Sequence, residues 1–313
     1  MFFWYSVFIM TKPKITAITG PSSSGKTALA IQLAKTLNGE IISVDSRQIY
    51  KELDIGSAKP SPEEREGITH HLIDIVDVTQ EYTAANFCDD AQAKIEDIVK
   101  RGKIPILAGG TGLYFRILLQ DFELPRVAPD KNLREELQKK TSEELYKQLQ
   151  KLDFKISEKI HPNNKVKIIR ALEVCLSLGI PMSEAQKKKE PEFNTLWIGL
   201  NSEDREFLYE RINKRTDMMF EAGLLEEAKN LFEKYGENNK ILTGTIGYQE
   251  LLPLIKGETD FEFASNLLKQ NTRRYAKRQI SWFKANKDIN WFDIKTQSIQ
   301  NIKEKALVLF NKI

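Results

Sequence analysis

Residues 20–27 read Gly-Pro-Ser-Ser-Ser-Gly-Lys-Thr and could bind phosphate groups. This is a complete G-x-x-x-x-G-K-[ST] pattern, in which backbone N–H groups and a helix N-terminus form a concave anion site. Lys26 would place a positive charge at the outer phosphates, and the Thr27 hydroxyl would coordinate the expected cofactor, Mg²⁺. The pattern does not say whether the phosphate is transferred, hydrolysed or displaced. The predicted phosphate-binding residues are Gly20, Pro21, Ser22, Ser23, Ser24, Gly25, Lys26 and Thr27.

Asp45 follows a second apolar run, 41–44. In a doubly wound sheet the carboxyl ends of the strands line the ligand crevice, so Asp45 and Lys26 would face the same space. There Asp45 could hold Mg²⁺ or accept a proton from a nucleophile. An aspartate at this position could also simply cap a turn or helix.

A third candidate segment is 108–114, Ala-Gly-Gly-Thr-Gly-Leu-Tyr. Its glycines allow a close approach of backbone to ligand, and Thr111 could contact the ligand or cap the helix that follows. No aspartate ends the preceding apolar run, so the metal-binding acid of hydrolytic motors is missing there. This absence from the sequence weakens an ATPase interpretation.

Arg211 and Arg215 are four residues apart in a predicted helix, 203–221. They could offer guanidinium groups to a departing phosphate or lie on a solvated face beside glutamates. His70 and His71 are adjacent in a predicted strand and would point to opposite faces, which argues against a metal site with two histidines.

The elements that must position these residues alternate between apolar strands and helices. This alternation predicts an α/β fold: a parallel sheet of the phosphate-loop type, flanked by helices on both faces. From 124 to 190 the strands cease and amphipathic helices follow, which predicts an all-helical insertion between two core parts, 10–123 and 191–313. Strands are expected at 14–20, 40–45, 71–77, 104–110, 195–200 and 290–294, and core helices at 26–37, 86–101, 111–121, 203–221, 224–234 and 260–284.

Charge is unevenly distributed along the chain. Residues 126–189 hold 15 Lys and Arg against 9 Asp and Glu, a net charge of +6, although the whole chain has only +3. Residues 267–287 hold seven Lys and Arg and no acid. Such zones suit solvated helix faces, but beside a phosphate loop they also indicate a polyanionic partner such as nucleic acid.

Composition excludes several protein classes. The chain has 313 residues, 41% hydrophobic and 29% charged, as expected of a globular enzyme rather than a membrane protein. Cys88 and Cys175 fit reduced core residues. Residues 1–9 are apolar but too short to span a bilayer and without the basic residues of an export signal, so we interpret them as a mis-assigned upstream start or a frayed extension. We expect a cytoplasmic monomer with no membrane partner.

Several motifs together resemble the tRNA dimethylallyltransferases, also called isopentenyl-tRNA or IPP transferases. The series runs over nearly the whole chain from Ile15, and its order is far more specific than the phosphate loop alone. One departure is Asn164, where the family often has aspartate. The matching segments are 20–27, Asp45-Ser46-Arg47-Gln48-Ile49-Tyr50, Asp54-Ile55-Gly56-Ser57-Ala58-Lys59-Pro60, 70–74, 109–114, His161-Pro162-Asn163, 170–174, Gly247-Tyr248 and Ala276-Lys277-Arg278-Gln279.

The resemblance implies a phosphate loop that binds the diphosphate of dimethylallyl diphosphate. It implies transfer of the dimethylallyl group to the N6 amine of adenosine 37, next to the anticodon, with Asp45 as base and with Thr111 and Arg215 at the diphosphate. The partner would be tRNA, gripped at its anticodon stem-loop, with the target base flipped into a channel. The residues implied to contact tRNA are Asp45, Ser46, Arg47, Gln48, Thr111, Arg134, Val166, Lys167, Ile168, Ile169, Arg170, Arg273, Arg274, Lys277 and Arg278.

Two other functions remain open from the residues alone. In a small-molecule or nucleotide kinase, Asp45 would deprotonate a hydroxyl and the insertion would be a lid. An insertion with a net charge of +6 suits an RNA clamp better than a lid. In a non-catalytic RNA-binding module, the phosphate loop would have no purpose.

Overall fold

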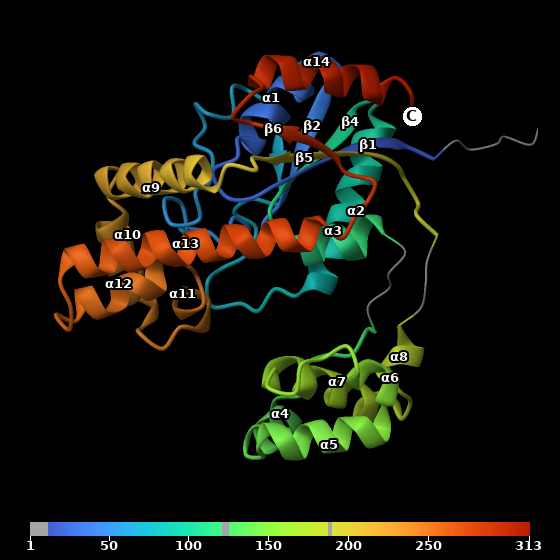
Figure 1. Ribbon diagram of the computed structural model, residues 1–313, viewed down its shortest axis with the longest axis vertical. Coiled ribbons are helices and arrows are strands. Elements are labelled where there is room, and N and C mark those ends of the chain that lie inside the picture. The colour runs from blue at the N-terminus through green and yellow to red at the C-terminus, as the bar shows by residue number, and fades with distance from the viewer. Residues whose placement is uncertain (1–11, 121–124, 187–189) are drawn as a thin grey trace, which may run out of the picture. The chain divides into compact units, whose positions relative to one another are not determined.

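A six-stranded parallel sheet forms the centre of the larger part of the protein (Figure 1). The structure is a computed structural model that describes residues 12–120, 125–186 and 190–313. The strand order β3-β2-β4-β1-β5-β6 places the first strand between two strands that follow it in sequence. This is the predicted α/β fold of the phosphate-loop type. The strands are β1 (Lys14–Thr19), β2 (Gly39–Val44), β3 (His70–His71), β4 (Ile104–Gly109), β5 (Asn194–Asn201) and β6 (Asn290–Asp293).

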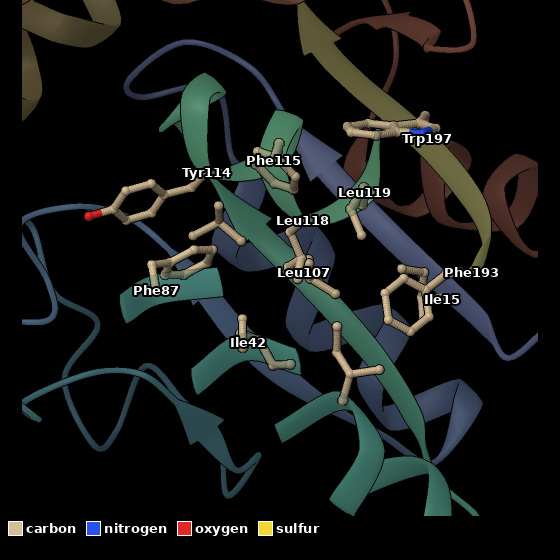
Figure 2. Packing of buried hydrophobic residues seen from close by; sticks show 14 of the residues in the cluster. Ile15, Ile42, Phe87, Leu107, Tyr114, Phe115, Leu118, Leu119, Phe193 and Trp197 are labelled. Carbon is tan, nitrogen blue, oxygen red and sulfur yellow. The ribbon is translucent and has the colours of Figure 1, made fainter. Parts of the chain in front are cut away.

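Helices cover both faces of the sheet because its strands are apolar on both sides. On one face, Ile42 and Leu107 pack against Phe87 and Phe115 (Figure 2). On the other face, Ile18 packs within a cluster supplied by the first and last helices. The covering helices are α2 (Ala84–Lys100), α3 (Gly112–Leu119) and the end of α13 (Phe261–Phe283) on the first face, and α1 (Lys26–Leu37) and α14 (Ile299–Phe310) on the second.

A third apolar cluster joins the loop after β2 to a group of helices in the second half of the chain. Ile49 and Leu53 from the loop pack with Tyr248, which is fully buried. The loop between Asp45 and Lys59 is therefore held against these helices rather than exposed at the sheet edge. The group consists of α10 (Leu224–Tyr235), α11 (Lys240–Thr243), α12 (Tyr248–Ile255) and the first half of α13, and α9 (Arg205–Glu221) packs against α13.

The chain divides into two compact units. Residues up to Leu119 and from Glu192 onward form the unit with the sheet, and Gln120–Pro191 forms the other. The described part of the second unit is helical, with Leu145, Leu149 and Leu172 in its core. Its helices are α4 (Lys131–Gln138), α5 (Ser142–Leu152), α6 (Phe154–Ser157), α7 (Lys165–Leu178) and α8 (Met182–Ala185).

The predicted strand over 71–77 is wrong beyond its first residue. Strand β3 covers only His70 and His71, because Leu72 and Asp74 adopt positive φ angles of 59° and 58° that end the extended backbone. Helices α8, α11, α12 and α14 were not predicted. The interpretation of residues 1–9 as an upstream extension lies outside the described residues. Among the helices of the described residues, none has the length and apolar character needed to cross a membrane.

Candidate active site

Three adjacent strand ends border one cavity of about 600 Å³ in the sheet unit. The phosphate loop follows β1, Asp45 follows β2, and Gly109–Gly110 ends β4. The register pairs Val44 with Gly109, so Asp45 lies level with the glycines. The sheet topology thus brings together residues that the sequence separates widely, as the strand-end argument predicted.

The phosphate loop requires its two glycines. Gly20 has a φ of 148°, and a Cβ on it would lie 2.3 Å from the carbonyl oxygen of Leu200. Gly25 has a φ of 91° and begins α1 without any side chain that caps the helix. The first-turn N–H groups of α1 therefore remain available for an anion.

Lys26 is the first residue of α1, and its side chain folds back over the start of the phosphate loop. Its Nζ donates to the carbonyl oxygens of Gly20, at 3.1 Å, and Pro21, at 2.7 Å. Burial first, and the charge of Arg215 second, lower the pKa of Lys26 to about 7, while Asp45 opposes the shift. Binding of an anion would restore the full charge of this lysine.

Two arginines of α9 complete the cationic wall. Arg211 Nε donates to the Ser23 carbonyl oxygen at 2.9 Å, and Arg215 donates to the Ala58 carbonyl oxygen at 3.4 Å. Burial lowers the pKa of Arg215, while the carboxylates of Glu64 and Asp45 oppose the shift. Both arginines line the cavity: Arg215 is half-buried, and Arg211 is exposed but bonded to the phosphate loop.

Asp45 both caps a turn and faces the cavity, the two alternatives that the sequence left open. Its Oδ1 accepts from the backbone N–H groups of Arg47, at 2.8 Å, and Gln48, at 3.4 Å, so the residue caps the turn that follows β2. The same side chain also lines the cavity beside the phosphate loop. One oxygen thus fixes the carboxylate, and the other is left for a ligand.

Thr111 lies behind the cavity wall rather than in it. Its Oγ1 accepts from the backbone N–H of Ser46 at 3.1 Å, and its own N–H donates to the Val44 carbonyl oxygen at 3.2 Å. The cavity wall at this strand end is formed by Gly109 and Gly110. Thr111 therefore positions the segment that carries Asp45, in addition to any contact that it makes with a ligand.

A second cavity of about 340 Å³ shares Asp45, Arg215 and Tyr275 with the first. Its wall includes the apolar side chains of Ile212 and Leu268. Burial and the charge of Asp45 raise the pKa of Tyr275 to about 12, so its phenol stays neutral at physiological pH. An anion-binding space and a partly apolar space therefore meet at one carboxylate.

The basic segment at 267–287 lies in α13 as far as Phe283 and continues four residues beyond the helix. Arg274, Lys277 and Arg278 are exposed, and Arg278 also lines the second cavity. Arg273 has a protein partner instead: it donates to the Asn213 Oδ1 at 2.6 Å and lies over the Tyr209 ring. Ser46 and Arg47 line the second cavity, and Gln48 lines the first.

The candidate residues of the helical unit divide into three groups. Arg134 and Arg170 both pair with the fully buried Glu173, at 2.8 Å and 2.6 Å. Val166 and Lys167 are exposed at the start of α7. The side chains of the other two residues, Ile168 and Ile169, lie in the core of the unit and do not form part of its surface. Asn164 accepts from the Lys167 N–H at 3.2 Å and thereby caps α7.

Sequence reasoning missed the roles of two buried or partly buried polar residues. Gln279 bonds to both the phosphate loop and Gly110. Glu227 accepts from the N–H groups of Ile55, at 2.8 Å, and Gly56, at 2.9 Å, and so holds the loop over the cavity. Both pairings span more than 160 residues, and nothing in the local pattern signals them.

The donor set of the cavity fits Mg²⁺ bound mainly through a ligand's phosphates. Thr27 offers an exposed hydroxyl in the cavity wall, and Asp45 lies in the same wall. Within the described ranges, no cluster of three or more His, Cys, Asp or Glu could hold a metal by itself. Mg²⁺ needs no such cage, because it keeps several waters and binds through few protein groups plus substrate phosphates.

Known proteins resemble this chain over nearly its full length. A profile described as IPP transferase matches residues 48–286. A tRNA dimethylallyltransferase of Halothermothrix orenii is 44% identical over 295 residues, which cover 92% of this chain and 90% of that protein. A second, from Alkaliphilus metalliredigens, is also 44% identical and covers 95% and 96%.

Solved structures give the same result. A tRNA isopentenylpyrophosphate transferase from Bacillus halodurans has a TM-score of 0.72 and 38% identity, covering 96% of this chain and 98% of that one. A eukaryotic dimethylallyltransferase acting on tRNA has a TM-score of 0.83 and 34% identity, covering 96% and 79%.

Proposed function

The chain belongs to the IPP transferase family, and on this premise we propose that it transfers a dimethylallyl group from dimethylallyl diphosphate to the N6 amine of adenosine 37 in tRNA. One observation carries the proposal: the cationic cavity of Lys26 and Arg215 meets the partly apolar second cavity at Asp45. A prenyl diphosphate needs cations at one end, and an incoming base needs a proton acceptor at the other.

In the first part of the reaction, the diphosphate binds as a leaving group. The loop N–H groups, Lys26 and Arg215 neutralise the charge that develops as the allylic C–O bond breaks. Bound Mg²⁺, held by the Thr27 hydroxyl and the phosphates, would add positive charge to the same oxygens. The bonding electrons leave with the diphosphate.

In the second part, the adenine N6 amine forms the new N–C bond. This amine is a weak nucleophile because its lone pair is delocalised into the ring. Asp45 accepts the N6 proton through the oxygen that does not cap the turn. The base must leave the anticodon stack to reach Asp45, and the second cavity is the space that would receive it.

The RNA backbone would lie along exposed cations. Arg274, Lys277 and Arg278 belong to a 21-residue stretch of sequence without acids, 267–287, which suits phosphate contacts. In the helical unit, Val166 and Lys167 are exposed at the start of α7, and Arg134 and Arg170 share one carboxylate. We assign the anticodon stem to that unit. A cytoplasmic location and a monomeric state complete the proposal.

The kinase alternative has no comparable support. It would require a nucleoside triphosphate to fill the first cavity, yet the end of β4 bears no acidic residue that could hold the metal of a phosphoryl transfer. One parallel assay distinguishes the two functions: the protein is incubated with unmodified tRNA and labelled dimethylallyl diphosphate, or with tRNA and labelled ATP. Label in tRNA from the prenyl donor supports the proposal, and phosphoryl transfer from ATP contradicts it.

A further inference from the structure

One buried amide links the phosphate loop to the end of β4. Gln279 Oε1 accepts from the Ser22 backbone N–H at 2.9 Å and from the Ser22 hydroxyl at 3.4 Å. Gln279 Nε2 donates to the Gly110 carbonyl oxygen at 3.1 Å. Gln279 is only 6% exposed and Gly110 is buried, so removal of the amide would leave the Gly110 carbonyl oxygen without this donor.

The bridge requires both a donor and an acceptor at one position. A Cβ on Gly110 would lie 2.0 Å from Gln279 Nε2, so a larger residue there would displace the Gln279 amide. The φ of Gly110 is not in the left-handed region, so a side chain there would disturb this contact rather than strain the backbone. Gln279 and Gly110 thus contact each other closely, and both line the first cavity.

The helix that carries Gln279 also carries the exposed cations Arg274, Lys277 and Arg278. Arg278 is the preceding residue and lines the second cavity, and Tyr275, one turn earlier, lines both cavities. Helix α13 is a continuous helix of 23 residues. Gln279 therefore connects the helix that carries these cations directly to Ser22 of the phosphate loop.

We propose that Gln279 is a positioning residue that couples RNA binding on α13 to diphosphate binding in the loop. The coupled element has two states, with the Ser22–Gln279–Gly110 bridge formed or broken. RNA that immobilises α13 favours the formed bridge, and the formed bridge holds the loop ready for the diphosphate. Since such coupling is reciprocal, each substrate raises the affinity of the other. The inference rests on the proposed function, because it requires both substrates.

The test measures this coupling directly. The dissociation constant of dimethylallyl diphosphate is determined by calorimetry with and without a saturating anticodon stem-loop whose target adenosine is replaced by purine riboside, which has no amine to react. For the unaltered protein we expect RNA to tighten donor binding at least about 5-fold. For Gln279→Met the ratio should fall to nearly 1, while RNA affinity alone changes less than about 2-fold.

A matched control uses the same substitution at an exposed glutamine of the same helix. Gln270→Met should leave the coupling ratio unchanged. A Gln279→Met variant that keeps the full ratio overturns the inference, as does an unaltered protein whose donor affinity ignores the RNA. The proposed function is judged separately, by prenyl transfer to unmodified tRNA, so either idea can fail alone.

A second variant breaks the bridge from the other side. Gly110→Ala displaces the Gln279 amide without changing α13, and it should abolish the coupling as Gln279→Met does. In a Gln279→Ala background the clash is removed, so Gly110→Ala should have little further effect. If the two substitutions instead add independently, the residues do not act as one bridge, and the inference is wrong.

Discussion

The Ser46 backbone N–H donates to the Thr111 hydroxyl oxygen over 3.1 Å, and this bond ties the end of β2 to the end of β4. In this hydrogen bond, Ser46 is the residue after Asp45, and Thr111 is the second residue after Gly109. A threonine that does not line either cavity thus holds the backbone of the residue that follows Asp45.

The Ser46–Thr111 bond predicts a difference between two substitutions. Thr111→Ser keeps the hydroxyl and should retain kcat within about 3-fold. Thr111→Val keeps the shape but leaves the Ser46 N–H unpaired, at a cost of about 1–3 kcal/mol, so kcat/KM should fall roughly 5- to 100-fold. Steady-state kinetics with tRNA and donor check this, and equal activity of the two variants would contradict it.

Asp45 allows its capping and chemical roles to be separated. Asn retains an oxygen that accepts from the Arg47 N–H but cannot accept the N6 proton. Asp45→Asn should therefore keep the melting temperature and the tRNA affinity while kcat falls by about 10²–10⁴. Asp45→Ala should lose stability as well. An asparagine variant with at least half of the original kcat would remove Asp45 from the mechanism.

The lowered pKa of Lys26 predicts proton uptake on donor binding. In the protein without bound donor, Lys26 has a pKa of about 7, so most Lys26 side chains are neutral at pH 8. A bound diphosphate favours the charged form and raises this pKa, so the complex takes up a proton between about pH 7 and the ordinary value of 10.5. Calorimetry at pH 8 in two buffers of different ionisation enthalpy measures the number of protons. Lys26→Met should show smaller uptake and weaker binding; identical heats in both buffers for the unaltered protein would refute the prediction.

The cations of α13 predict a salt-dependent RNA affinity. Each phosphate contact to a single-stranded region contributes about −0.7 to the log–log slope of affinity against salt. Arg274→Ala with Lys277→Ala should flatten the slope by one to two contacts and leave donor affinity in the absence of RNA unchanged. Two exposed lysines of α2, Lys94 and Lys100, provide a matched pair of Ala substitutions that should have no such effect. If the plots of RNA affinity against salt concentration coincide for the α13 variant and the unaltered protein, RNA does not bind through Arg274 and Lys277.

Glu173 predicts acid sensitivity of the helical unit. Burial opposes its ionisation, but hydrogen bonds from Arg134, Arg170 and the Asp130 N–H outweigh it and hold its pKa below 4.5. Because this folded-state pKa is lowered, its contribution to stability is complete above about pH 4.5 and is lost as the pH falls through the lower value. Glu173→Gln should cost about 1–3 kcal/mol at neutral pH and show a weaker loss of stability in acid. Unfolding curves from pH 7 to 3 for both proteins check this; parallel losses would exclude Glu173 as a cause.

The part of the fold that depends on periodicity was predictable. Strands such as β1 and β4 are short apolar runs followed by glycines, and their shared edge follows from the rule for parallel sheets. The strand after Thr69 was misjudged because Leu72 and Asp74 turn the chain by local conformation, which an apolar pattern does not reveal. Helix α14 was missed although its sequence, 299–310, is amphipathic.

The candidate site was predictable where a residue type implies chemistry. The phosphate loop, Asp45 and Arg215 each have a side chain or spacing that suggests a ligand, and all line one cavity. The roles of Gln279 and Glu227 were not predictable, because each depends on backbone groups more than 160 residues away. The pairing of Arg134 with Glu173 was not predictable either, because it joins side chains of two helices that are 39 residues apart in the sequence.

Helix α14 covers the helix of the phosphate loop, and this has a consequence for synthesis of the protein. Ile302, Ala306 and Phe310 share a buried cluster with Leu29 and Leu33 of α1, and Ile299 Cδ1 would lie 3.3 Å from a Cβ on Gly25. The ribosome makes α1 early and its cover more than 250 residues later. Until then α1 lacks the part of its apolar cover that α14 supplies, so the nascent chain carries the complete loop sequence before this cluster can close.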